Sequence, residues 1–304
     1  MSEGLRRNIG QLPFFDFRLV YWADYINPEP LDPNEKDPGH PLYIAEPYLP
    51  AGAASDEEET EETRRPFKKK IKSRITRMLL SDRFMHIFPA VTESAMRKRF
   101  REIDIYYSSD AIGKADKTKA TAQEYLRSVL AETLSHHRRR RIVLIAHSMG
   151  SLIACDVLYS LDFAIDTFIT IGSPLGIPLI VEKVREEQRG AIVSNRKITA
   201  PGCISGQWIN LFDPRDEVGC RHRLGDSFAP NSRGVAPEDI AVTNDYRTDA
   251  RANPHKVYGY LRCPEISKVL FELITKGKSR PRLFMEKGFT GLLYKFGRIF
   301  RENS

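Results

Sequence analysis

Cysteine is scarce in this 304-residue chain, and its four cysteines lie far apart. Cys155, Cys203, Cys220 and Cys263 form no CxxC pair, which argues against a structural zinc site or a thioredoxin-type redox centre. We therefore expect buried free thiols, because an unpaired cysteine behaves as a small hydrophobic side chain. The sequence predicts no metal ion and no cofactor.

Long apolar runs are also missing. No uncharged apolar stretch reaches about 18 residues, the length that crosses a bilayer, and the opening MSEGLRRNIG lacks the apolar core of a signal peptide. These absences predict a soluble, cytoplasmic protein. Hydrophobic residues make up 41% of the chain, which is enough for a full-sized core and excludes disorder for most of its length.

Basic charge is concentrated at the carboxyl end. The net charge is +7, and residues 276–304 hold eight Lys and Arg against two Glu, so the remaining chain is almost neutral. No groove-reading or base-stacking motif accompanies the basic residues, and we expect no nucleic-acid partner.

Apolar strands alternate with amphipathic helices along the chain. Strands are expected at residues 15–25, 142–146, 166–171, 208–212 and 240–243, and helices at 71–107, 117–136, 152–161, 179–188 and 264–275. This alternation predicts the α/β class, with a mostly parallel sheet covered by helices on both faces. We expect the strands at residues 15–25 and 142–146 to be buried, and the second of them to be buried on both faces.

The expected domain covers residues 1–275, with a charged low-complexity loop at 51–70 and a separate tail at 276–304. Within 283–300, apolar residues recur every three or four positions with Lys and Arg between them. As a helix, the tail would be amphipathic and cationic and would suit an anionic membrane surface. A terminal helix docked on the body is the alternative, and both stay open.

The clearest chemical signal is the sequence IVLIAHSMGSLIA, in which Ser148 stands between an apolar strand and an apolar helix. A serine on such a turn adopts strained backbone angles and presents its hydroxyl at the carboxyl edge of the sheet. We expect the small residues Ala146 and Gly150 to let strand and helix approach closely. The helix start adds partial positive charge where an oxyanion would develop.

The AHSMG sequence around Ser148 resembles the nucleophile elbow of the α/β-hydrolases, particularly their lipase- and esterase-like members, with alanine for the first glycine of GxSxG. TIGSPLG at residues 170–176 resembles the segment after the next strand of those proteins. The resemblance covers about residues 16–274. It implies that Ser148 attacks a carboxylic ester, which includes lipid esters, and that the Met149 amide is one oxyanion donor.

A serine nucleophile requires a base and an acid, which follow the serine in the order acid, then histidine, in this fold. WINLFDPRDEV offers Asp213 and Asp216 after a strand. Asp216 resembles the acid of the family, whereas Asp213 is either an alternative acid or a side-chain cap of the turn. His255, in NPHKVYGY, resembles the His-x-x-Tyr ending of the family and is the expected base; His222 is the alternative.

The second oxyanion donor has no counterpart in the sequence. In the α/β-hydrolases it comes from a His-Gly loop after an earlier strand, and Gly39-His40 follows no strand. Three explanations are open: a missing amino-terminal portion, which we favour, a displaced strand at 15–25, or a catalytically impaired relative. The last corresponds to a different function, a non-catalytic module that binds a membrane surface or a protein partner.

Overall fold

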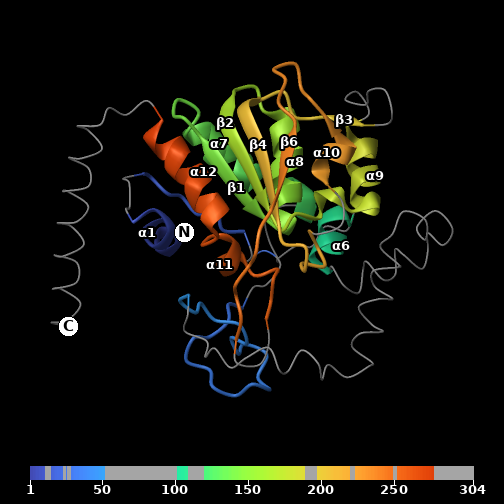
Figure 1. Cartoon of the computed structure of the whole chain (residues 1–304). Coiled ribbons are helices and arrows are strands. Elements are labelled where there is room, and N and C mark those ends of the chain that lie inside the picture. Colours follow the sequence, from blue (N-terminus) through green and yellow to red (C-terminus); the bar gives the residue numbers. More distant parts are fainter. Residues whose placement is uncertain are drawn as a thin grey trace. The chain divides into compact units, whose positions relative to one another are not determined.

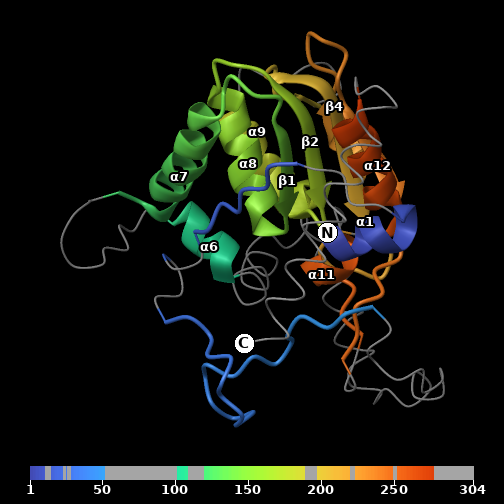
Figure 2. The ribbon, with the colours of Figure 1, turned by 90° about the vertical axis from the view of Figure 1, so that its left-hand side faces the viewer.

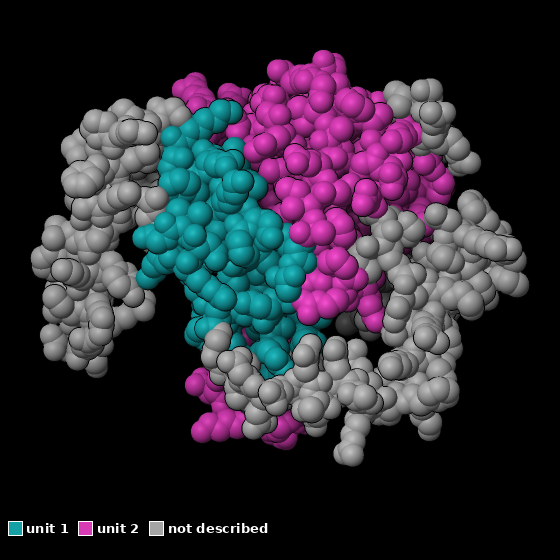
Figure 3. All heavy atoms as spheres, viewed as in Figure 1, with its two compact units in different colours: residues 1–19, 48–54, 242–304 teal, residues 20–47, 55–241 magenta. Residues whose placement is uncertain are grey.

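The computed structural model describes residues 1–10, 15–22, 25, 29–51, 101–108, 120–188, 197–219, 223–248 and 252–276. The chain divides into two compact units, which Figure 3 colours separately. Unit 1 comprises residues 1–19, 48–54 and 242–304, and unit 2 comprises residues 20–47 and 55–241. The predicted charged loop and basic tail lie almost wholly outside the described residues and stay predictions.

Unit 2 contains a parallel sheet of four strands (Figure 1). The strands are β1 (Val143–His147), β2 (Ile165–Ile171), β4 (Ile204–Phe212) and β6 (Pro237–Ala241), in the order β1-β2-β4-β6. All three neighbouring pairs are parallel. The predicted α/β class with a mostly parallel sheet is confirmed, and four of the five expected strands overlap those observed.

Short elements complete the described part of unit 2. A second, two-stranded parallel sheet pairs β3 (Ile198–Thr199) with β5 (Phe228–Ala229). The 3-10 turn η2 (Pro174–Gly176) follows β2, and the short helix α10 (Leu224–Ser227) packs near β6.

Four helices of unit 2 are α6 (Arg101–Tyr107), α7 (Ala122–His136), α8 (Met149–Ser160) and α9 (Pro178–Glu187). Figure 2 shows α6, α7 and α8 on the same side of the sheet. The helix predicted from residue 117 begins later, because Thr121 and Glu124 form a capping box. Of the helix predicted at 71–107, α6 confirms the end, and residues 71–100 lie outside the described part.

The predicted strand at residues 15–25 is wrong. Residues 15–22 form no strand, and Phe17, Leu19 and Tyr21 are 57%, 75% and 58% exposed. Val20, Trp22 and Tyr25 pack against the core of unit 2. Aromatic and β-branched composition shows that a segment suits an extended conformation, but it does not supply the neighbouring strand that a ladder needs.

The prediction that the strand at 142–146 is buried on both faces is also wrong. Val143, Leu144 and Ile145 of β1 are only half-buried, and β1 is an edge strand of the sheet that the described residues form. β2, which has a neighbour on each side, has the nearly continuous burial expected of an inner parallel strand.

A buried ionic network joins α6, α7, α8 and α9. Asp156 on α8 is 4% exposed, and its Oδ2 accepts hydrogen bonds from the Tyr106 hydroxyl at 2.5 Å and from Arg127 Nη2 at 2.8 Å. Arg127 also pairs with Glu187 on α9. Burial raises the pKa of Asp156, and the guanidinium of Arg127 opposes that rise. The positive charge of Arg127 therefore balances the negative charge of the buried Asp156 carboxylate.

We expect Arg127→Ala to lower the free energy of unfolding by about 3 kcal/mol, because it leaves Asp156 buried without its cation. Arg139→Ala, at an exposed position after α7, is the matched control and should change it little. The raised pKa of Asp156 means that the folded state takes up a proton before the unfolded state does as the pH falls. The difference in free energy of unfolding between the wild type and Arg127→Ala should therefore become smaller toward pH 4, as measured by urea melts. A difference independent of pH would contradict this role of Arg127.

Unit 1 contains α1 (Ser2–Ile9), α11 (Val257–Tyr260) and α12 (Pro264–Thr275), and α1 packs against α12. The predicted limits of the last helix are confirmed. A Cβ at Gly4 would lie 2.7 Å from Arg262 Cα, so glycine is required for the close approach of α1. No helix in the described part of the chain is long and apolar enough to cross a membrane.

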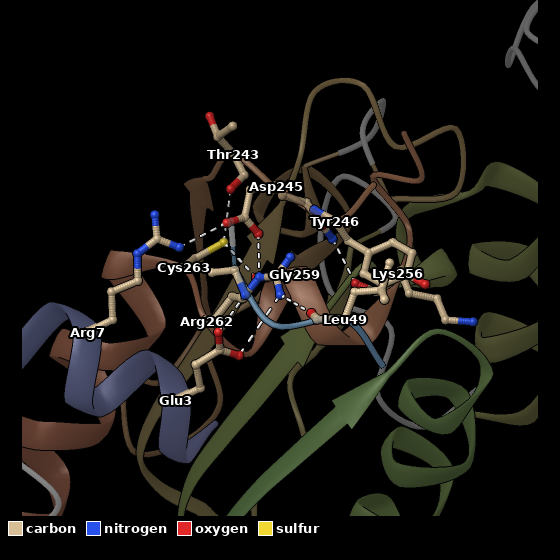
Figure 4. Close-up of polar contacts among 12 residues, drawn as sticks. Glu3, Arg7, Leu49, Thr243, Asp245, Tyr246, Lys256, Gly259, Arg262 and Cys263 are labelled. Atoms are coloured by element: carbon tan, nitrogen blue, oxygen red, sulfur yellow. Dashed lines mark hydrogen bonds and ion pairs between the residues drawn. The ribbon is translucent and has the colours of Figure 1, made fainter. Parts of the chain in front are cut away.

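The side chain of Arg262 makes hydrogen bonds with two other segments of unit 1, at Leu49 and at Asp245 (Figure 4). Its side chain is 4% exposed; Nε donates to Asp245 Oδ1 at 2.6 Å, and Nη1 donates to the Leu49 carbonyl at 2.6 Å. Arg7 on α1 pairs with the other oxygen of Asp245 at 3.1 Å. These contacts hold α1 and the 242–248 segment against the start of α12.

Candidate functional site

Three strands of unit 2 end in register at one edge of the sheet. His147 lies opposite Ile171, and Ile171 lies opposite Leu211. The ladder continues one residue further, because Ser148 N donates to the Ile171 carbonyl at 3.2 Å and Gly172 N donates to the Leu211 carbonyl at 3.1 Å. The segments that follow β1, β2 and β4 therefore leave the sheet side by side.

Ser148 has a strained backbone. Its φ of 51° and ψ of −129° make it the only non-glycine residue with positive φ among the described residues. Such a conformation costs on the order of 1–3 kcal/mol and persists only where the surroundings enforce it. β1 ends at His147 and α8 begins at Met149, so Ser148 alone forms the turn. This is the strand–serine–helix geometry that the sequence predicts.

Met149 is the first residue of α8 and is 2% exposed. Its amide belongs to the first turn of the helix, where N–H groups have no partner within the helix and the dipole is positive. The expected need for a small residue at Gly150 is wrong in the described structure, because a Cβ there would meet no described atom within 4 Å. Ala146 is buried at 7% exposure.

Asp213 is fully buried, and Arg215 engages its carboxylate. Oδ1 accepts hydrogen bonds from Arg215 N at 2.7 Å and Nε at 3.1 Å, and Oδ2 accepts one from Nη2 at 2.8 Å. These contacts form a side-chain turn cap with a local ion pair. They favour the turn-cap role that the sequence left open for Asp213.

Asp216 is also fully buried and lies one turn further along the same loop. Its Oδ1 accepts a hydrogen bond from Val218 N at 2.8 Å, and its own N–H donates to the Asp213 carbonyl. The loop folds back over the end of β2, since a Cβ at Gly219 would lie 3.0 Å from Gly172 Cα. This loop therefore lies against Gly172, whose strand end is next to Ser148.

His255 lies in unit 1, in the turn before α11, and is half-buried. The amide of Asn244 donates to the carbonyls of Pro254 and Lys256, the two neighbours of His255, at 2.9 and 2.8 Å. Asn244 is 3% exposed, and a Cβ at Gly259 would fall 1.6 Å from its Oδ1. Asn244 and Gly259 thus fix the backbone on both sides of His255, a role that sequence reasoning missed.

Ser148, Met149 and Asp216 lie in unit 2, whereas His255 lies in unit 1. The assignment of His255 as the base therefore stays a prediction from chain order and from the His-x-x-Tyr sequence. The alternative base, His222, is outside the described residues.

The described cysteines are free and buried, as expected, and Cys220 lies outside the described residues. Burial raises the pKa of Cys155 well above its usual value and that of Cys203 to about 11. Neither thiol is therefore a thiolate at neutral pH, and neither competes with Ser148 as a nucleophile. Among the described residues, no group of three His, Cys, Asp or Glu side chains is placed to hold a metal ion.

The sheet edge and the serine turn define an α/β protein with a strained strand–serine–helix turn. The family model of lecithin:cholesterol acyltransferase matches residues 116–185, a range that includes β1, Ser148, α8 and β2. Comparisons with curated proteins and with solved structures gave no significant match. The parallel sheet and the family match together fit a lipase-like α/β hydrolase and support an ester-cleaving or acyl-transferring activity in general terms.

Proposed function

We propose that this chain is a serine hydrolase that cleaves a carboxylic ester through an acyl-enzyme. Ser148 is the nucleophile, His255 the base, Asp216 the acid that orients the imidazole, and Met149 N–H an oxyanion donor. The observation that carries the proposal is the backbone of Ser148, at φ 51° between β1 and α8. Strain at a single residue on the edge of a parallel sheet marks a functional position.

In the proposed reaction, Ser148 Oγ attacks the ester carbonyl carbon while His255 accepts the hydroxyl proton. The oxyanion that forms is stabilised by Met149 N–H at the start of α8. Collapse of this intermediate expels the alcohol, which takes its proton from His255, and leaves an acyl group on Ser148. Water then attacks the acyl-enzyme with His255 as base and releases the carboxylic acid.

We propose a lipid ester as substrate, because the matched family is that of lecithin:cholesterol acyltransferase. The basic, amphipathic pattern at 283–300 would suit contact with an anionic lipid surface. We therefore propose that the protein is cytoplasmic and contacts the membrane surface peripherally.

A non-catalytic module that binds a membrane or a partner is the second candidate. It is favoured by the lack of a recognised second oxyanion donor: Gly39 and His40 lie in an exposed turn, where His40 N donates to the Asp37 carbonyl. Loss of one oxyanion donor typically costs about 2.7–4 kcal/mol of transition-state stabilisation.

Labelling with a fluorophosphonate probe separates the two candidates, because the probe reacts only with an activated serine. We expect the folded wild type to be labelled and Ser148→Ala not to be. Ser128→Ala is the matched control, since Ser128 is exposed on α7, and it should be labelled like the wild type. A folded wild type that takes up no label would favour the module.

Substitution of Asp216 should lower the rate of hydrolysis, whereas substitution of Asp213 should lower the stability of the protein. Asp216→Asn is expected to lower kcat for ester hydrolysis by about 10³, because the imidazole loses its orienting carboxylate. Asp213→Asn should mainly lower the melting temperature, because it weakens the contacts with Arg215. Initial rates with a p-nitrophenyl ester and melting curves check both; a larger rate loss in Asp213→Asn would reverse the assignment.

A further inference from the structure

The carbonyl of Ser148 accepts two hydrogen bonds from Ser151, a residue of α8. Ser151 N donates to the Ser148 carbonyl at 2.9 Å, and Ser151 Oγ donates to the same oxygen at 2.6 Å. Ser151 is fully buried, although it lies in an otherwise apolar stretch of the helix. A buried hydroxyl without partners is costly, so this one is fixed by the bonds that it makes.

The hydrogen bonds continue to the segment after β2. Ser151 Oγ lies 2.7 Å from Ser173 Oγ, and Ser173 Oγ accepts a hydrogen bond from Leu175 N at 3.2 Å. Because Ser151 uses its one hydroxyl proton on the Ser148 carbonyl, Ser173 must donate to Ser151. The bonds therefore run in one direction, from Leu175 N through Ser173 and Ser151 to the Ser148 carbonyl.

This series of hydrogen bonds fixes the whole Ser148–Met149 peptide group and not the carbonyl alone. The carbonyl of Ser148 and the N–H of Met149 belong to one planar peptide group, in which they point in opposite directions. A peptide whose oxygen is fixed by two hydrogen bonds cannot turn its N–H. Ser173, which is 4% exposed and caps the η2 turn, anchors the hydroxyl that makes one of those bonds.

We propose that Ser151 and Ser173 are positioning residues, which fix the strained Ser148–Met149 peptide so that Met149 N–H points toward the oxyanion of the reaction. This inference rests on the proposed function. It assigns to the serine of GSPLG a role in preorganising the site, at the point where β2 meets the elbow. The transition state gains from such fixed donors, whereas ground-state binding gains little.

Kinetics of single and double variants test the inference. Ser151→Ala and Ser173→Ala should each lower kcat for a p-nitrophenyl ester about tenfold with KM nearly unchanged, the effect of one weakened hydrogen bond in the transition state. Since Ser173 acts through Ser151, the double variant should be no slower than Ser151→Ala alone. Ser173→Thr keeps the hydroxyl and should restore kcat, and Ser128→Ala is the neutral control.

Three results would each overturn the inference. They are a loss of kcat in the double variant equal to the product of the two single losses, a rise in KM with kcat unchanged, and failure of Ser173→Thr to restore kcat. A wild type without esterase activity and without probe labelling would instead overturn the proposed function. Amide hydrogen exchange at Ser151, whose N–H is bonded to the Ser148 carbonyl, gives a readout that needs no activity. It should quicken in Ser173→Ala, and unchanged exchange would overturn the inference in an active or an inactive protein.

Discussion

Ser148→Ala is expected to lower kcat for ester hydrolysis by about 10⁴–10⁶, because removal of the nucleophile leaves only binding and the oxyanion donor to assist water. KM should change little, since the hydroxyl reacts with the substrate rather than holding it. Initial rates with a p-nitrophenyl ester, after removal of contaminating esterases, measure the loss. A residual rate within tenfold of the wild type would contradict the assignment of Ser148.

Ser148→Gly gives a matched control for the strain. It should be as inactive as Ser148→Ala, but glycine adopts a φ of 51° without strain, so its free energy of unfolding should exceed that of Ser148→Ala by about 1 kcal/mol. Urea melts of the two variants measure this difference. Equal stability would show that the positive φ of Ser148 stores no strain.

His255→Ala is expected to lower kcat by about 10⁴, the upper range for loss of a general base. The physical reason is that a serine hydroxyl is a poor nucleophile unless its proton is removed as it attacks. His222→Ala should retain most of the activity, and His40→Ala, at an exposed turn, should retain all of it. Initial rates of the three variants decide between the two candidate bases.

Substitutions around His255 distinguish a chemical role from a structural one. Gly259→Ala should lower kcat without touching the imidazole, because its Cβ would displace the Asn244 side chain that fixes the carbonyls on both sides of His255. If His222→Ala, and not His255→Ala, abolished hydrolysis, the base would belong to the loop that carries Asp216.

The sequence was most informative where a local pattern determines local geometry. An apolar strand, one serine and an apolar helix predict the elbow, and the structure gives Ser148 the positive φ that such a turn requires. The ends of β1, β2 and β4 were also predictable, because apolar runs in parallel strands stop where polar or glycine residues begin. The sequence also predicts a turn cap as one of two roles for Asp213, and the hydrogen bond from Arg215 N favours that role.

Contacts between distant residues could not be predicted. The composition of residues 15–25 does not show whether a neighbouring strand is present, so it predicts a strand where residues 15–22 form none. The link from Ser151 to Ser173 joins two segments that meet only when β1 and β2 pair. Glycine is needed at 259 because a Cβ there would collide with the side chain of Asn244, which lies 15 positions earlier in the chain.

A crystal structure of the protein after reaction with a fluorophosphonate would test the account most directly. We expect phosphorus bonded to Ser148 Oγ, its oxygen hydrogen-bonded to Met149 N–H, and the imidazole of His255 between the adduct and the Asp216 carboxylate. An adduct on another residue, or a phosphonylated Ser148 with His255 and Asp216 both remote from it, would contradict the proposed hydrolase.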